Sequence, residues 1–145
     1  YTGAITQEDF RTGYTKDWFI KAYDAYEPDE EVLEELKKPL KKHTIKAFMG
    51  TWCPDSRRET PKLLKLLDEV NFKEKNLEIY AMDHYKSTEA NYEEDLDVHH
   101  VPTIIFFDKK GNEINRFVEF PQETFEEDIL KIVTNQSYQN PYAEE

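Results

Sequence analysis

The sequence Gly50-Thr-Trp-Cys-Pro-Asp-Ser56 joins two stretches of different character, and this junction decides the fold. A short apolar run, 45–49, precedes it and predicts a buried strand that stops at Gly50. From Pro54 to Val70 the leucines recur at helical spacing, which predicts a long amphipathic helix. Cys53 therefore falls at the first turn of that helix, where unpaired backbone N–H groups and the helix dipole favour a thiolate over a thiol.

The segments after this helix complete an α/β pattern. Residues 77–82 predict a second strand, and two strands joined by one helix imply a parallel, right-handed βαβ unit. Residues 103–119 predict a hairpin of two strands around a turn at 108–112. Between these units we expect a weaker helix over 89–96, and Pro121 is expected to open a last helix.

The N-terminal part of the chain is expected to be helical after an irregular start. Residues 1–13 are polar and interrupted by glycines, 15–26 carry aromatic residues at helical spacing, and Pro28 begins a further helix. The length suits one domain over 1–145. Within it we expect a helical extension over 1–41, a core over 42–136 and a loose polar tail over 137–145.

The composition argues against several classes of function. A net charge of −12 disfavours a nucleic-acid partner and an anionic membrane surface. One cysteine rules out an internal disulfide and a zinc site built on several cysteines. The sequence has four glycines and no phosphate-binding loop, and it lacks the run of about 18 apolar residues that a membrane-spanning helix needs. We therefore expect no cofactor and no metal.

Three motifs in this order resemble the thioredoxin superfamily over about 42–133. Trp52-Cys53-Pro54-Asp55-Ser56 is similar to the family's Trp-Cys-x-x-Cys signature, with serine in place of the second cysteine. Pro61 matches a proline that kinks the active-site helix, and Val101-Pro102-Thr103 resembles the cis-proline loop, which lies against the reactive sulfur. The resemblance implies a three-layer α/β/α sandwich with a central mixed sheet and, here, an N-terminal helical extension.

The resemblance also implies roles for individual side chains. Cys53 would be the nucleophile, and the Ser56 hydroxyl, three residues further on, would stabilise its thiolate. Arg57 and Arg58 would add positive charge nearby. Substrate binding is expected to involve Trp52, Pro54, Val101, Pro102 and His100.

Two neighbouring histidines leave a choice of roles. His99 and His100 precede the Pro102 loop and should therefore lie within reach of Cys53. One of them could tune the thiolate or contact substrate, or both could join the thiol in a metal site. Two or three ligands fall short of a closed site, so we favour the contact role for His100.

Two departures from the family pattern bear on the chemistry. Ser56 leaves no resolving thiol, so a dithiol–disulfide cycle cannot run within this chain. Ala47 stands where the family buries an aspartate that helps to deprotonate the second cysteine. The sequence therefore predicts a monothiol protein that acts in thiol–disulfide exchange through Cys53 mixed disulfides, as an isomerase or a mixed-disulfide reductase. The alternative is a non-catalytic protein-binding module with the thioredoxin fold.

Partners and location follow from the same features. We expect a disulfide-containing protein or a low-molecular-weight thiol as partner, and a monomeric state. A single unpaired cysteine fits either the cytoplasm or the periplasm of a bacterium. Because the chain begins at Tyr1 rather than Met, an export signal could have preceded it, and we favour an exported protein.

Overall fold

The computed structural model describes residues 2–88 and 90–143. Most of the expected helices and strands are present, and their bounds agree with the hydrophobic periodicity within a few residues. In chain order the elements are β1 (Gly3–Ala4), α1 (Gln7–Thr12), α2 (Lys16–Ala25), α3 (Glu30–Leu40), β2 (Thr44–Met49), α4 (Pro54–Glu69), the 3₁₀ turn η1 (Glu74–Asn76), β3 (Leu77–Ala81), β4 (Thr103–Phe107), β5 (Glu113–Val118) and α5 (Phe125–Val133).

The strands form one mixed sheet in the order β1-β3-β2-β4-β5. β2 and β3 run parallel, with Ala47 opposite Ile79, and α4 connects them as the sequence predicts. β4 is antiparallel to both β2 and β5, and β1 is antiparallel to β3. The predicted α/β class with a central mixed sheet is confirmed.

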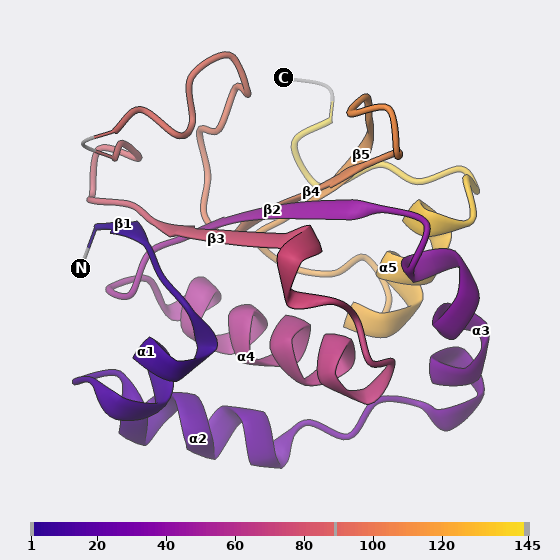
Figure 1. Ribbon diagram of the computed structural model, residues 1–145, viewed down its shortest axis with the longest axis horizontal. Coiled ribbons are helices and arrows are strands. Elements are labelled where there is room, and N and C mark those ends of the chain that lie inside the picture. The colour runs from indigo at the N-terminus through magenta and orange to yellow at the C-terminus, as the bar shows by residue number, and fades with distance from the viewer. Residues whose placement is uncertain (1, 89, 144–145) are drawn as a thin grey trace.

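The two faces of this sheet are covered by different kinds of structure (Figure 1). Successive residues of a strand point to opposite faces, so β2 sends Ala47 to one side and Phe48 to the other. The α-helices of the described residues gather on the Ala47 side and build the larger core. The segment between β3 and β4 lies on the Phe48 side and closes a smaller core, which contains Cys53.

The prediction of a helix over 89–96 is wrong for residues 90–96, and Glu89 lies outside the described residues. This part of the chain consists of turns, because Asn91 and Asp95 adopt left-handed backbone conformations with φ of 56° and 64°. Such residues cannot continue a right-handed helix. Where a helix was expected on this face of the sheet, a loop covers it.

The start of the chain is more regular than its polar composition suggests. Residues 3–4 pair with β3, and α1 begins after a capping box in which Thr6 and Asp9 bond each other's backbone N–H groups. The pattern Thr6-x-x-Asp9 is a capping box, which marks the start of a helix. An overall polar composition gives no sign of it. Phe10 is fully buried, so α1 belongs to the core.

The end of the chain also departs from expectation. The last helix begins at Phe125 rather than Pro121, because Thr124 caps it through the N–H of Glu127. The tail is docked instead of loose: the hydroxyl of Tyr138 donates to Asp128 at 2.9 Å. Residues 144–145 lie outside the described part of the chain. Within that part, no helix has both the length and the apolar character needed to cross a membrane.

Candidate functional site

Cys53 is the N-cap residue of α4, at the end of the turn that follows β2. Its backbone N–H donates to the carbonyl of Gly50 at 3.0 Å, and its own carbonyl accepts the N–H of Arg57 at 3.0 Å. Pro54 occupies the first helical position, where its missing N–H costs no hydrogen bond. The strand-to-helix junction that the sequence predicts thus places the thiol at the N-terminus of α4.

The sulfur faces the loop before β4. The Cys53 thiol donates to the carbonyl oxygen of Val101 at 3.6 Å, and the Val101–Pro102 peptide bond is cis, as the family resemblance implies. Cys53 is 8% exposed. Its neighbours in the smaller core are apolar: Phe48, Tyr80, Met82, Val98, Val101, Ile105 and Phe107.

Ser56 is fully buried, and the hydrogen bond that the structure gives it serves the turn. Its hydroxyl oxygen accepts the backbone N–H of Gly50 at 3.0 Å. The bond from Ser56 to the sulfur, which the sequence suggested, is absent from the described contacts. Ser56 therefore fixes the path of the chain from Gly50 into α4, on which the position of Cys53 depends.

The two arginines after Ser56 are tied to other groups. The Arg57 guanidinium donates to the carbonyl of Thr51 at 2.6 Å and lies 5.3 Å from the ring centre of Trp18 on α2. Arg58 forms ion pairs with Asp55 at 2.8 Å and with the fully buried Glu59 at 2.6 Å. Arg57 therefore stabilises the turn at Thr51, and Arg58 stabilises the first turns of α4.

Trp52 lies across the turn beside the thiol. Its indole Nε1 donates to the carbonyl of Met82 at 2.9 Å. The ring stacks on His84 with centroids 4.1 Å apart, and the Lys86 ammonium lies 5.4 Å from its centre. The turn after β3 thus places His84 against Trp52, which the sequence predicts as a substrate-binding residue.

The structure places His100 in a cluster with two residues that sequence reasoning missed. Its Nδ1 lies 3.3 Å from the Glu119 carboxylate, and its ring stacks on Tyr142 with centroids 3.7 Å apart. The Tyr142 hydroxyl donates to the same carboxylate at 2.7 Å. The substrate contact predicted for His100 stays a prediction, and the amino-acid sequence holds no local signal for this long-range cluster.

His99 is exposed and, with His100, borders a polar hollow of about 430 Å³ between the tail and β5. Cys53 is not among the residues that line this hollow. No group of three or more His, Cys, Asp or Glu side chains within 2–88 and 90–143 is arranged to hold a metal ion.

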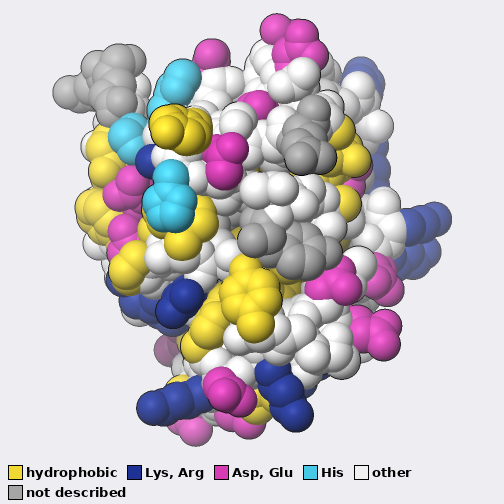
Figure 2. All heavy atoms as spheres, turned by 90° about the vertical axis from the view of Figure 1, so that its left-hand side faces the viewer, with side chains coloured by type: hydrophobic (Ala, Val, Ile, Leu, Met, Phe, Trp, Pro, Cys, Tyr) yellow, Lys and Arg dark blue, Asp and Glu magenta, His cyan; other side chains and the backbone are white. Residues whose placement is uncertain are grey.

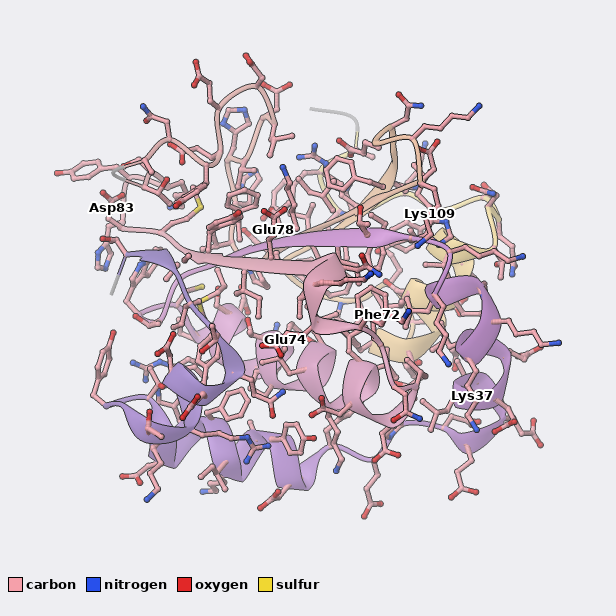
Figure 3. The ribbon with its side chains drawn as sticks, viewed as in Figure 1. Lys37, Phe72, Glu74, Glu78, Asp83 and Lys109 are labelled. Carbon is pink, nitrogen blue, oxygen red and sulfur yellow. The ribbon has the colours of Figure 1, made fainter. Side chains whose placement is uncertain are left out.

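The turn after β3 is organised by Asp83, a residue that the motifs of the sequence did not single out. Its carboxylate accepts the Ser87 hydroxyl at 2.9 Å and the backbone N–H groups of Tyr85 and Ser87. These hydrogen bonds, that from the Ser87 side chain first, lower the pKa of Asp83. Figure 3 shows Asp83 at the end of the sheet that also carries the α4 N-terminus. The bond from the Tyr85 N–H back to Asp83, two residues earlier, is an Asx turn, and Asp is a residue that favours such turns.

Aromatic side chains are exposed around this end of the sheet. Tyr14 donates to, or accepts from, the Thr51 hydroxyl at 2.8 Å, and Tyr85 is 90% exposed. Figure 2, which views this end, shows hydrophobic and histidine side chains among acidic ones. Among the described residues, the exposed large hydrophobic side chains are Tyr14, Tyr85, Tyr92 and Phe120.

Comparison with known proteins agrees with this fold. The chain is similar in structure to an HIV epitope-scaffold, with 16% identity, a TM-score of 0.69 and coverage of 93% of this chain and 94% of the other. It is also similar to a protein of unknown function from Pseudomonas aeruginosa, with 16% identity, a TM-score of 0.62 and coverage of 92% and 81%. At such identities these likenesses concern the fold, and no curated protein matches the sequence. A family model described as thioredoxin matches residues 4–131, so the chain belongs to the thioredoxin family.

Proposed function

We propose that the protein exchanges thiols and disulfides through Cys53 alone, by forming mixed disulfides with a disulfide-bearing protein or a low-molecular-weight thiol. The observation that carries the proposal is the position of the sulfur. It lies at the N-terminus of α4 and 3.6 Å from the Val101 carbonyl. Unpaired N–H groups at a helix start stabilise a thiolate, which is the reactive form in exchange.

Each step of the exchange balances with one protein sulfur. Loss of the thiol proton to solvent breaks the hydrogen bond to Val101. The Cys53 thiolate attacks one sulfur of the partner's disulfide; that S–S bond breaks, and the leaving sulfur takes a proton from water. A second thiolate, from the partner or from a small thiol, then attacks the mixed disulfide and returns Cys53 as a thiolate. This sequence suits isomerisation or removal of mixed disulfides.

The surroundings of the thiol favour a protein partner. Tyr14, Tyr85 and Phe120 are exposed. Tyr14 bonds Thr51 in the turn before Cys53, Tyr85 lies in the turn held by Asp83, and Phe120 follows Glu119, whose N–H donates to the carbonyl of Pro102. These contacts place them at the end of the sheet where Cys53 lies, and exposed aromatic groups are typical of recognition surfaces. Because Cys53 is 8% exposed, a partner must reach it in an extended segment that enters beside Trp52.

A binding module without turnover is the second candidate, and one observation favours it. The thiol is hydrogen-bonded and nearly enclosed by apolar side chains, as a structural cysteine would be. In that case the aromatic surface would bind its partner without any covalent step.

Incubation of the folded protein with oxidised glutathione separates the two candidates. For an exchange protein we expect one glutathione adduct by intact mass, formed in the folded state, with Cys53→Ala as the control that gives none. No adduct on the folded protein, when the urea-unfolded protein forms one, would exclude the exchange role.

Ser56→Cys gives an independent readout. A second thiol three residues after Cys53 supplies the missing resolving group, so this variant should gain the ability to reduce a protein disulfide in the presence of an external reductant. Ser56→Ala, which removes the hydroxyl that accepts the Gly50 N–H and adds no thiol, is the control and should not gain this ability. No gain in Ser56→Cys, in a protein that still folds, would mean that Cys53 does not reach disulfides.

A further inference from the structure

Four lysines from three separate segments meet in one cavity at the end of the sheet opposite Cys53. The cavity has a volume of about 350 Å³. Lys41 follows α3, Lys73 and Lys75 lie between α4 and β3, and Lys109 lies in the turn between β4 and β5. Figure 3 labels Lys109 and Phe72 at this end of the sheet, far from Asp83. The complete lining is Lys41, Asn71, Phe72, Lys73, Lys75, Asn76 and Lys109.

The backbone that presents these lysines is hydrogen-bonded at each turn. Asn71 takes a left-handed conformation with φ of 56° where α4 ends, and the N–H of Phe72 returns to the carbonyl of Leu67 at 2.9 Å. The next turn closes when Asn76 donates to the carbonyl of Lys73 at 2.9 Å. The lysine stems therefore leave from fixed positions.

The turn that carries Lys109 is held in the same way. Asp108 accepts the backbone N–H groups of Lys110 and Asn112 at 2.9 Å each, and these bonds lower the pKa of Asp108. The Asp108 carboxylate is thus committed to its own turn and does not line the cavity.

The cavity concentrates positive charge in a chain whose net charge is −12. None of the residues that line it is acidic, and within the described residues none of its four lysines forms an ion pair. The nearby Glu74 lines a different cavity, beside α1. The C-termini of α3 and α4 together supply about one negative charge, against four positive ones. All four lysines are exposed, so solvent and salt screen their mutual repulsion, and an anion that enters the space between them is attracted by all four.

We propose that this cavity binds a compact polyanion with three or four negative charges, such as an oligophosphate group. The lysine ammonium groups provide the charge, as they do at other phosphate sites, and the side-chain amides of Asn71 and Asn76 can donate to the anion's oxygens. The volume suits a small ligand. The proposal is independent of the function of Cys53.

Isothermal titration calorimetry with tripolyphosphate tests this on the full chain. We expect one site, weakened at least about tenfold in Lys73→Ala/Lys109→Ala and weakened by added salt. The matched control is Lys16→Ala/Lys21→Ala on α2, which removes the same charge from exposed positions outside the cavity and should bind as the parent does. Circular dichroism checks that both variants fold.

The outcomes divide cleanly. Citrate, titrated in the same way, tells whether the site requires phosphate groups. Binding of both anions supports a general polyanion site, and binding of tripolyphosphate alone assigns the site to phosphate groups. No binding by the parent protein overturns the proposal. An equal loss in both double variants also overturns it, because it would trace the affinity to overall charge.

Discussion

Gly50 shows how closely the site is packed at the scale of one residue. Its N–H donates to Ser56, and the indole of Trp52 lies directly over its Cα. A Cβ added at this position would lie 2.6 Å from Cε2 of Trp52, which is closer than real side chains allow. The absence of a side chain at Gly50 is what lets Trp52 lie flat beside the thiol.

Gly50→Ala should therefore lower the free energy of unfolding by about 1–3 kcal/mol, the usual cost of overpacking. Urea denaturation followed by circular dichroism measures the change. In a Trp52→Ala background, where nothing lies over the new methyl group, the same substitution should cost much less. An equal cost in both backgrounds would show that the contact with Trp52 is not the cause.

Tyr23 provides a titration test at the residue scale. Burial and the hydrogen bond to Asp68, 2.5 Å away, raise the pKa of Tyr23 from 10.0 to about 12. Because the folded value exceeds the unfolded one, this contribution to stability is complete below pH 10 and is lost as the pH rises toward 12.

The ultraviolet absorbance of tyrosinate, taken as the difference from Tyr23→Phe, should show this late titration. Asp68→Asn removes the charge and should move the titration of Tyr23 to lower pH. If Asp68→Asn left that titration in place, burial alone would account for the shift.

At the scale of elements, Asp128 connects α5 to the two segments around it. Its carboxylate accepts the N–H groups of Gln122 at 2.7 Å and Glu123 at 3.0 Å, and the hydroxyl of Tyr138 at 2.9 Å. The Asp128 side chain is almost fully buried beneath these three donors. Burial first, and then the charge of Asp128 and the hydrogen bond to it, raise the pKa of Tyr138.

Asp128→Ala should destabilise the fold by about 3 kcal/mol, since it removes three hydrogen bonds to one carboxylate. Tyr138→Phe removes one of the three bonds and should cost about 1 kcal/mol. The neighbouring Glu127→Ala is the control and should change stability by less than about 0.5 kcal/mol. Equal effects of Asp128→Ala and Glu127→Ala in thermal denaturation would contradict this assignment.

The elements differ in how far their sequence determines them. α4 and β4 were predictable because one carries leucines at helical spacing and the other an unbroken apolar run. The segment over 90–96 was not, because left-handed residues such as Asn91 depend on their hydrogen bonds with neighbours. The position of Cys53 against Val101 followed from motifs, whereas the contact of His100 with Glu119 depends on a loop and a strand end that no local pattern relates.

At the scale of the whole molecule, the N-terminal segment, for which the sequence predicts an extension, packs into the larger core. Phe10 and Phe19 stack with centroids 5.1 Å apart, and both are fully buried. They belong to the same core as Leu64 and Leu67 of α4, and α4 is the helix that Cys53 caps. Losing a buried phenylalanine costs about 3–5 kcal/mol, a large part of the roughly 5–15 kcal/mol that typically holds a domain together.

A chain that begins at Glu27 should therefore show no cooperative thermal transition by circular dichroism. A chain that ends at Gln136, which lacks the tail but keeps the core, should still show one at a lower temperature. If the chain beginning at Glu27 unfolded cooperatively at the parent's temperature, α1 and α2 would be dispensable.

The chain carries its thiol at one end of a single sheet and its clustered lysines at the other, with the length of the strands between them. Nothing seated among the lysines would shield the sulfur, and an adduct on the sulfur would leave the lysines uncovered. Binding free energies at two such distant sites add. An adduct on Cys53 and an anion among the lysines can therefore be present together, and each stabilises the folded state as if the other were absent.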